Sequence, residues 1–461
     1  MRFLLALIVA LLVAAGAAWV IAGRGGGPVI TINQPSKFVG QAGTLDVTIE
    51  TPKGTLNRFE AYVEQQGRRI PLATSLSAPG VQMTQEGADR IRLRRELGKR
   101  SVPELQAGDA KITIVAARPS GFYGVALRTL ESSITRDVRV RFEPPRVSVV
   151  STHHFINHGG AEFIVYRASP PDVESGVKVG DVEYHGFPAS DAAPLAGVQL
   201  GDPALKVAFF ALLHDQDLNT PISLYARDEA GNTARADFEY RVFPKAMRKS
   251  RIELPDAFIN RVVPGILEHT PDLKAEGSVL DQFLRINGEL RRRNAEQIAQ
   301  LGHKGSGPAL FSGAFQQLAN SQVEAAFADQ RTYFYQGKEV DRQVHLGFDL
   351  ATTANAPIVA SNRGKVLHAD YLGIYGNCVI IDHGLGLQSL YAHLSSIDTA
   401  VGQTVDKGQT IGRSGMTGLA GGDHLHFTML VEGRMVNPTE FWDPHWLEDR
   451  VLRKLREAGT K

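Results

Sequence analysis

Two pairs of potential metal ligands, three histidines and one aspartate, lie at short spacings near the C-terminal end of this 461-residue chain. His345 and Asp349 are four residues apart, and His424 and His426 are two apart. Side chains two apart on a strand point to one face, and side chains four apart share a face on a strand or on a helix. If the two pairs face each other, they form a cluster of two or three imidazoles and one carboxylate. That is the ligand set of a catalytic zinc, which keeps one coordination position open.

Each pair alone is a weak signal, because such spacings arise often by chance and their ordinary reading is an exposed strand face. The surrounding sequence changes this, since it resembles, block by block, the lysostaphin-type (LytM-type) zinc metallopeptidases that cut peptidoglycan peptides. The resemblance covers about residues 327–442. Its blocks are His345-Leu-Gly-Phe-Asp-Leu350, Gly364-Lys-Val366, Gly376-Asn-Cys-Val-Ile-Ile-Asp-His-Gly384, Tyr391-Ala-His-Leu394, Val405-Asp-Lys-Gly408, Ile411-Gly-Arg-Ser-Gly415, Gly418 and His424-Leu-His-Phe427.

The resemblance implies a role for each of five residues. His345, Asp349 and His426 match the three ligands of a Zn²⁺ cofactor, whereas His393 and His424 match two histidines that do not bind the metal. The residues alone leave open which member of the His424/His426 pair takes the metal. A positioned imidazole can take a proton from the hydrolytic water and later protonate the leaving amine, and a second can stabilise the oxyanion. We assign these two roles jointly to His393 and His424.

Other residues of the resemblance concern the surroundings of the site. Asn377, Tyr391 and Arg331 are expected to shape the substrate groove, although a Tyr or Asn there can equally hold a turn or strand. His383 resembles an exposed strand-end histidine of the family. Ala328 stands where the family often has Gly, at the entrance to the groove.

Composition limits the classes of protein that fit. With 43% hydrophobic and 21% charged residues, the chain is globular, and its length suggests about three domains. The net charge of +1 gives no reason to expect a nucleic-acid partner. The single cysteine, Cys378, cannot form an intramolecular disulfide, and its apolar neighbours predict a small buried residue.

The N-terminal segment Phe3–Ala22 has no charged residue and about the length that a membrane-spanning helix needs. We expect an uncleaved anchor with a flexible tether at Arg24-Gly-Gly-Gly-Pro28, giving a membrane region over residues 1–28. A cleaved secretion signal is the alternative. An anchor and a secretion signal would both carry the rest of the chain across the membrane. We therefore expect a single-pass protein of the inner membrane, with the bulk of the chain in the periplasm or cell envelope.

The middle of the chain first has β and then helical patterns. Leu45, Val47 and Ile49 alternate with polar residues, which predicts a strand with one buried face. Residues 29–143 and 147–243 are predicted to be two tandem immunoglobulin-like β-sandwiches. Residues 244–326 are predicted to be a helical linker region, with a capping box at Ser278 and Asp281. We expect Arg291-Arg-Arg293 to lie on a solvated face at the end of a helix, the alternative being contact with anionic lipid headgroups or glycan-polymer phosphates.

The C-terminal part reads as short β-rich runs separated by Gly and Asn, which predicts an antiparallel β zinc peptidase domain over residues 327–443. A C-terminal helix is predicted over residues 444–461, with an apolar stripe at Trp446, Leu447, Val451 and Leu455. The overall fold class is therefore mainly β.

The expected function is a zinc-dependent endopeptidase that hydrolyses peptide bonds of peptidoglycan stems or cross-links in the cell envelope. Two alternatives remain: a non-catalytic adaptor that regulates other wall hydrolases, and a latent enzyme whose groove is covered by the segment Pro244–Gln330 or by a β domain. The sequence does not indicate protein partners, oligomeric state or the bond that is cut.

Overall fold

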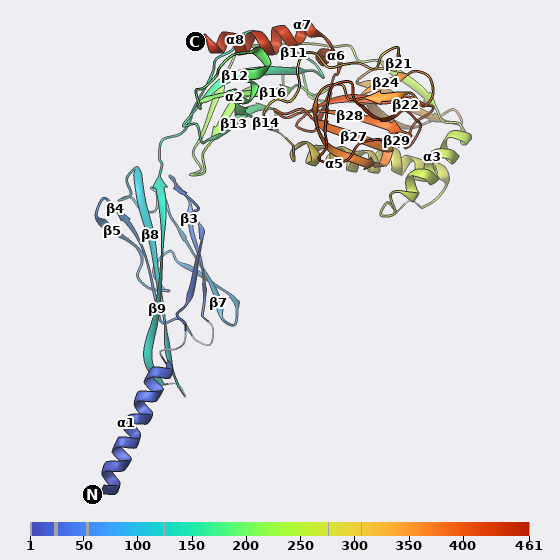
Figure 1. Ribbon diagram of the computed structural model, residues 1–461. Coiled ribbons are helices and arrows are strands. Elements are labelled where there is room, and N and C mark those ends of the chain that lie inside the picture. The colour runs from blue at the N-terminus through green and yellow to red at the C-terminus, as the bar shows by residue number, and fades with distance from the viewer. Residues whose placement is uncertain are drawn as a thin grey trace. The chain divides into compact units, whose positions relative to one another are not determined.

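The computed structural model describes residues 2–22, 26–51, 55–122, 125–274, 276–305 and 307–460, which form two compact units (Figure 1). Unit 1 comprises residues 1–145 with 227–233, and unit 2 comprises residues 146–226 with 234–461. Arg24 and Gly25 of the predicted tether lie outside the described residues. Each unit has its own hydrophobic core.

Unit 1 contains two antiparallel-rich sheets, ordered β1-β3-β7-β6 and β2-β9-β8-β4-β5. Its elements are α1 (Arg2–Ala22), β1 (Val29–Gln34), β2 (Phe38–Val39), β3 (Thr44–Glu50), β4 (Arg58–Gln65), β5 (Arg68–Ala73), β6 (Gln82–Gly87), β7 (Arg90–Glu96), β8 (Gly108–Phe122) and β9 (Val125–Val140). Ile49 of the first sheet and Ile112 of the second belong to the same buried cluster, so the sheets share one core. The immunoglobulin-like character stays a prediction.

The alternation predicted for β3 is confirmed for its apolar face, since Leu45, Val47 and Ile49 are buried. The polar face of the same strand is less exposed than expected. Asp46 is also buried, because Arg92 and Arg94 of β7 form ion pairs with its carboxylate. The alternating pattern therefore identified the strand but did not predict that arginines of the neighbouring strand would bury part of its polar face.

Among the residues that the structure describes, no helix reaches the length and apolar character that a bilayer crossing requires. The predicted membrane-spanning helix over Phe3–Ala22 is therefore not supported.

Unit 2 begins with sheets ordered β10-β12-β16-β15 and β14-β13-β17-β18, and a two-stranded sheet β11-β19. These elements are β10 (Arg146–Val149), β11 (His154–Asn157), β12 (Ala161–Ser169), β13 (Glu174–Val179), β14 (Val182–His185), β15 (Phe187–Pro188), α2 (Ala189–Ala196), β16 (Leu205–Ala211), β17 (Ile222–Arg227), β18 (Thr233–Asp237) and β19 (Tyr240–Phe243).

A mainly helical segment follows, made of β20 (Lys249–Glu253), α3 (Asp256–Glu268), α4 (Val279–Arg285), η1 (Ile286–Leu290) and α5 (Arg291–Gly302). The capping box at Ser278 and Asp281 is confirmed: the hydroxyl of Ser278 accepts from the backbone N–H of Asp281, and the carboxylate of Asp281 accepts from the backbone N–H of Ser278. The helix does not end at Arg291, however. A π-helical turn at η1 leads directly into α5, so the prediction that Arg291 lies on a solvated helix end is wrong.

The C-terminal half of unit 2 is built on an antiparallel sheet ordered β21-β24-β32-β28-β27-β26-β30, with β33 paired to β32. Smaller sheets are ordered β20-β22-β23 and β25-β31-β29. The elements are β21 (Gln322–Ala325), β22 (Asp329–Tyr335), β23 (Lys338–His345), β24 (Phe348–Ala351), β25 (Pro357–Val359), β26 (Gly364–Tyr371), η2 (Gly373–Tyr375), β27 (Asn377–Asp382), β28 (Leu387–Leu394), β29 (Ser396–Ile397), β30 (Thr404–Val405), β31 (Thr410–Arg413), β32 (Leu425–Val431), β33 (Arg434–Val436), α6 (Thr439–Trp442), α7 (Pro444–Leu447), η3 (Glu448–Leu452) and α8 (Arg453–Gly459).

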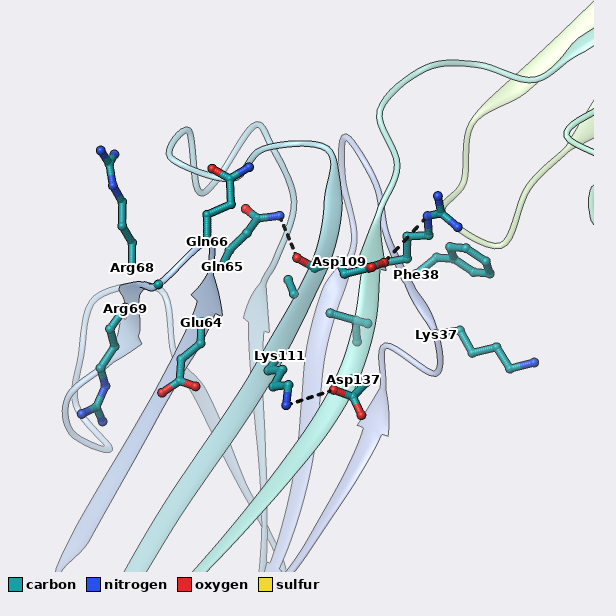
Figure 2. A pocket seen from close by; sticks show the side chains of 14 residues that line it. Lys37, Phe38, Glu64, Gln65, Gln66, Arg68, Arg69, Asp109, Lys111 and Asp137 are labelled. Carbon is teal, nitrogen blue, oxygen red and sulfur yellow. Dashed lines mark hydrogen bonds and ion pairs between the residues drawn. The ribbon is translucent and has the colours of Figure 1, made fainter.

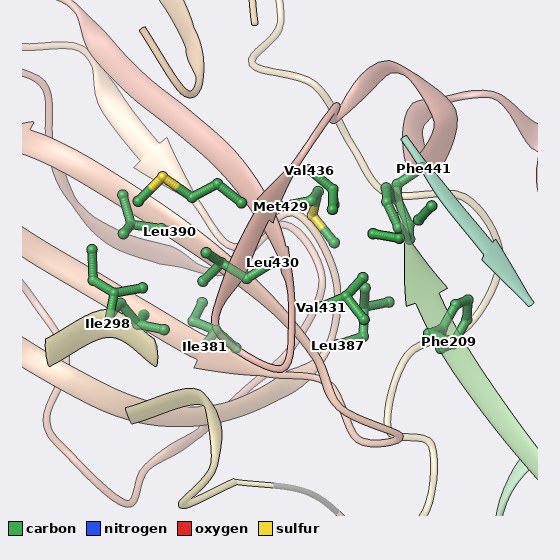
Figure 3. Packing of buried hydrophobic residues seen from close by; sticks show 14 of the residues in the cluster. Phe209, Ile298, Ile381, Leu387, Leu390, Met429, Leu430, Val431, Val436 and Phe441 are labelled. Carbon is green, nitrogen blue, oxygen red and sulfur yellow. The ribbon is translucent and has the colours of Figure 1, made fainter. Parts of the chain in front are cut away.

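One continuous core runs through unit 2 (Figure 3). Phe209 of β16, Ile298 of α5 and Leu430 of β32 all belong to it, as does Phe441 of α6. Cys378 is fully buried in the same core, as predicted. The C-terminal sheet is thus packed against both the preceding β sheets and the helical segment, and these neighbours determine what surrounds the histidine motifs.

Candidate active site

Neighbouring strands bring the histidine and aspartate motifs together. β24 pairs antiparallel with β32, and in that register Asp349 lies directly opposite His426. His345 is the last residue of β23, and the chain returns through Gly347 into β24. A Cβ at Gly347 would lie 2.5 Å from ring atoms of His426, so only glycine permits this close approach.

Three potential ligand atoms form a tight triangle. Nε2 of His345 lies 2.9 Å from Oδ1 of Asp349 and 3.0 Å from Nδ1 of His426. The third edge, from Nδ1 of His426 to Oδ1 of Asp349, is 3.0 Å. All three side chains are buried, so water does not separate these atoms from one another.

Hydrogen bonding outside the triangle fixes which nitrogen carries the proton. Nδ1 of His345 lies 3.2 Å from the carbonyl oxygen of Ala326, and a carbonyl can only accept. A neutral His345 therefore directs the lone pair of Nε2 toward the carboxylate of Asp349. Two lone pairs facing each other at this distance repel unless a cation lies between them. The donor set thus fits a divalent metal, and two imidazoles with one carboxylate are ligands that Zn²⁺ accepts.

His393 and His424 lie beside this triangle, and each binds a backbone carbonyl through Nδ1. Nδ1 of His393 donates to the carbonyl oxygen of Thr417 at 2.8 Å, and Nδ1 of His424 donates to that of Gly422 at 2.9 Å. Their ring centroids are 4.9 Å apart. Nε2 of His424 lies 3.4 Å from Oδ1 of Asp349. With both Nδ1 atoms occupied, both Nε2 atoms are available for proton transfer in the cavity.

The surroundings shift the pKa values of His393 and His424 in opposite directions. Burial, together with the nearby His424 and His426, lowers the pKa of His393 well below its usual value, so His393 is neutral near pH 7. Burial also lowers the pKa of His424, but its contact with Asp349 outweighs this and the net pKa is raised. For Asp349, burial raises the pKa, yet the surrounding imidazoles, His345 foremost, lower it well below the ordinary value. Asp349 is therefore ionised.

The five residues line a cavity of about 130 Å³. Arg331 also lines it, and its guanidinium donates to Oδ2 of Asp349 at 3.1 Å. Arg331 thus lies at the cavity, and its role in shaping a substrate groove stays a prediction. Its position on β22, which pairs with β23, explains this, because the same pairing places Asp329 opposite His345.

Tyr391 and Asn377 do not line this cavity. Tyr391 is 1% exposed. Its hydroxyl accepts from the backbone N–H of Ser361 at 2.7 Å and from the hydroxyl of Ser389 at 3.0 Å. Asn377 donates from Nδ2 to the carbonyl oxygen of Leu394 at 3.0 Å, which joins β27 to β28. Both predicted groove residues instead hold strands together, because the central strands of the sheet are covered on both faces.

Two other sequence interpretations also change. His383 is fully buried rather than exposed, and its ring bridges the carbonyl oxygen of Arg363 and the hydroxyl of Ser389. Ala328 has a left-handed backbone with φ of 64°, which explains why glycine suits this position. Its N–H donates to the carbonyl oxygen of His345 at 2.8 Å, so Ala328 supports the first residue of the triangle.

The cavity has a second wall that sequence reasoning missed. Arg291 and Ala295 of α5 line it, together with Tyr375 and Met435. Arg291 bonds to the carbonyl and side-chain oxygens of Asn287, one turn earlier. No sequence signal identifies Arg291 as a cavity residue, because only the long-range packing of α5 on the sheet brings it there.

A larger cavity of about 910 Å³ lies in unit 1, and Figure 2 shows its lining. Its charged side chains are of both signs: Lys111 faces Asp137 at 3.8 Å, and Arg139 faces Asp109 at 4.0 Å. Within the part of the chain that the structure describes, no cluster of potential metal ligands lies there. The smaller cavity in unit 2 is therefore the candidate active site.

Comparisons with known proteins agree with this choice. The model of peptidase family M23 matches residues 343–438. DD-carboxypeptidase/endopeptidase Mpg of Neisseria meningitidis is 41% identical over 96 residues, covering 21% of this chain and 22% of that protein. Peptidoglycan DD-endopeptidase ShyA of Vibrio cholerae is 42% identical over 93 residues, covering 20% and 22%. The chain thus spans about a fifth of the length of these relatives.

Two solved structures are also similar to parts of this chain. The catalytic domain of lysostaphin from Staphylococcus simulans is 27% identical, with a TM-score of 0.24, over 28% of this chain and 98% of that one. A zinc-containing peptidase from Vibrio cholerae is 15% identical, with a TM-score of 0.26, over 90% of this chain and 85% of that one. The family match, the named relatives and the motif blocks lead to one conclusion: residues 343–438 of this chain carry a peptidase family M23 domain.

Proposed function

We propose that this protein is a zinc-dependent endopeptidase that hydrolyses peptide bonds of peptidoglycan stems or cross-links. The observation that carries the proposal is the triangle of ligand atoms from His345, Asp349 and His426, with edges of 2.9 to 3.0 Å. A peptidase of this kind needs a metal, a proton acceptor and a proton donor within one cavity. The described residues supply a candidate for each.

The metal would be held by Nε2 of His345, Oδ1 of Asp349 and Nδ1 of His426. When bound, zinc acidifies a water molecule and polarises the carbonyl that is attacked. Arg331 holds the other carboxylate oxygen of Asp349, which keeps Oδ1 directed at the two imidazoles. Such support orients a ligand before the metal arrives and strengthens metal binding.

His393 and His424 would carry the proton transfers. His393 is neutral, so its Nε2 can accept a proton near pH 7. His424 has a raised pKa because of Asp349, so its Nε2 is suited to hold a proton and donate it to the leaving amine or to an oxyanion. Because zinc beside these rings would shift both pKa values, we keep the two roles joint.

The substrate class follows from the relatives, whose names describe peptidoglycan DD-endopeptidases. We propose that the bond cut is a cross-link between D-Ala and diaminopimelate, and that the protein acts in the cell envelope, where this polymer lies. A glycine bridge or a stem peptide is the alternative substrate.

A latent form of the enzyme is favoured by a specific observation. Arg291 and Ala295 of α5 line the cavity, and Arg261 of α3 donates to the carbonyl oxygens of Ala420 and Gly421 on its rim. A cavity of about 130 Å³ is smaller than the roughly 300 Å³ at which ligand pockets begin. The segment that includes α3 and α5 would then have to move before a peptide could enter.

The test combines metal content with hydrolysis. Purified full-length protein and the His345→Ala variant are incubated with zinc, and the release of new amino groups from peptidoglycan is measured. Mass analysis of defined muropeptides then identifies the bond. Zinc-free protein that digests nothing would support a non-catalytic adaptor instead. Zinc-bound but inactive protein that becomes active when the α3–α5 cover is loosened would support latency.

A further inference from the structure

A second group of potential metal ligands lies in unit 2, outside the candidate active site. It consists of His185, His303 and Glu432, whose nearest ligand atoms all lie within 4.8 Å of one another. The three residues come from different segments: His185 ends β14, His303 follows α5, and Glu432 lies in the turn between β32 and β33. Neither the proposed hydrolysis nor the M23 motif blocks use any of them.

The geometry centres on one carboxylate oxygen. Oε2 of Glu432 lies 2.8 Å from Nδ1 of His185 and 3.9 Å from Nδ1 of His303. The two imidazole rings are 6.1 Å apart and nearly perpendicular. Both histidine side chains are about half exposed, at 47% and 49%, so an ion from solvent can reach them and small rotations of the rings can close the remaining distance.

Glu432 has an unusual backbone for its residue type. It forms a two-residue hairpin turn with Gly433, and both residues have left-handed φ values, 47° and 74°. Such turns favour Asn or Asp before Gly, and a left-handed backbone is unfavourable for glutamate. The glutamate is nevertheless 5% exposed, with its carboxylate turned inward to His185. The backbone N–H of His185 also donates to Oε1, and a strained backbone at such a buried carboxylate is a reason to look for a function at this position.

The turn is held rigidly against its neighbours. A Cβ at Gly302 would meet the backbone of Gly433 at 2.3 Å, and a Cβ at Gly386 would meet Cγ of Glu432 at 2.9 Å. The end of α5, where His303 lies, is therefore packed directly on the turn. Rigid placement of ligands from separate segments is what a metal site requires.

The electrostatic surroundings favour a cation. Oε1 of Glu174 lies 3.8 Å from Nε2 of His185 and adds negative charge beside the cluster. His303 follows the C-terminus of α5, the end of a helix dipole that carries partial negative charge.

We propose that His185, His303 and Glu432 form a second metal site, which binds a divalent first-row transition metal such as Zn²⁺. Two imidazoles and a carboxylate are a suitable ligand set, with water completing the coordination. The site is distinct from the active site: Glu432 lies six residues beyond His426 on the same chain segment, about 20 Å along an extended strand. The metal would cross-link β14, the end of α5 and the β32–β33 turn.

The test is the zinc content of full-length protein after saturation and removal of loosely bound metal, compared with His303→Ala and His185→Ala. His445→Ala is the matched control, because His445 is an exposed histidine on a helix of the same unit. We expect the wild type and His445→Ala to retain one metal equivalent more than either cluster variant. Zinc should also raise the melting temperature of the wild type more than that of His303→Ala.

The site would be refuted if His303→Ala and His185→Ala retained as much zinc as the wild type, leaving His185 and Glu432 as an ion pair only. The His345→Ala variant separates this result from the proposed function. Protein that loses metal through His345→Ala alone supports the active site and overturns the second site. Protein that loses metal through His303→Ala alone supports the second site and argues against the proposed active-site metal.

Discussion

Nε2 of His345 and Nδ1 of His426 lie 3.0 Å apart, although 81 residues separate them in the chain. Two imidazole nitrogens are brought this close because β24 and β32 are neighbours and Gly347 leaves room for the His426 ring. Without a metal, two imidazole nitrogens and a carboxylate oxygen would crowd within 3.0 Å of one another in a buried place. The contact is therefore better suited to binding an ion than to stabilising the fold.

The first prediction concerns this triangle. His345→Ala removes one of three proposed ligands, so we expect loss of the tightly bound active-site zinc and loss of hydrolysis. His368→Ala is the control, because His368 lies outside the cavity and its Nε2 bonds to the carbonyl oxygen of Asp370 at 3.1 Å. Metal content and amine release are measured together. Full activity in His345→Ala would contradict the proposed centre.

The second prediction concerns His393 and His424. Alanine at either position should lower kcat by about 10²–10⁴-fold, the usual contribution of a general acid or base, while zinc stays bound. The double variant should lose little more than the worse single variant, because the two act in one reaction. Steady-state kinetics with parallel zinc analysis checks this. If metal content fell together with kcat, the residues would be ligands rather than proton carriers.

The third prediction concerns the cover over the cavity. Arg261→Ala removes the two hydrogen bonds from α3 to Ala420 and Gly421. Losing about 1 kcal/mol from the closed arrangement should raise kcat/KM about fivefold. Arg251→Ala, on β20, is the matched control, since Arg251 pairs with Glu253 and lies over Phe334 instead. Equal kcat/KM in wild type and Arg261→Ala would argue against latency through this contact.

The fourth prediction concerns Cys378. Burial raises the pKa of its thiol, and the side chain is fully enclosed in the core. A thiol reagent should therefore label the protein only after unfolding, and modification of folded protein should be undetectable by mass. Cys378→Ser places a hydroxyl in an apolar site and should destabilise the fold by about 1–3 kcal/mol. Rapid labelling of native protein would show that this part of the core opens readily.

The fifth prediction concerns pH. Burial raises the pKa of Glu440 to about 7, although Ala161 and Asn157 donate hydrogen bonds to its carboxylate. Because the folded-state pKa lies above the unfolded value of about 4.5, this group contributes stability below pH 4.5 and loses that contribution as pH rises to about 7. The loss is roughly 3 kcal/mol at most.

Glu440→Gln cannot titrate, so the melting temperature of the wild type should fall relative to that of this variant as pH rises from about 5 to 7. Chelator-treated protein is used for both, because metal release at low pH would otherwise add its own slope. A difference that stays constant over this range would show that Glu440 is already ionised in the folded protein.

Several features were predictable because they depend on neighbours in sequence. The capping box at Ser278 needs only Asp281, three residues on, and the stripe in the last helix needs only helical spacing. Residues Trp446, Leu447, Val451 and Leu455 are buried as that spacing predicts. Burial of Cys378 followed in the same way from its apolar neighbours.

Other features were decided by packing between distant segments. Tyr391 and His383 are buried because the central strands are covered on both faces, which no local pattern reveals. Arg291 reaches the cavity because α5 continues through a π-helical turn and lies on the sheet. The cluster of His185, His303 and Glu432 joins residues up to 247 positions apart.

The sequence by itself determined which chemistry can be proposed for this protein, because the five side chains of the candidate site lie in short motifs whose residue types limit what they can bind. Only the tertiary structure decided which atoms meet, how far the helical segment narrows the cavity, and which buried charges need partners. The physical reason is that ligand type is a property of single residues, whereas convergence, burial and exclusion of water depend on contacts made when strands and helices pack together.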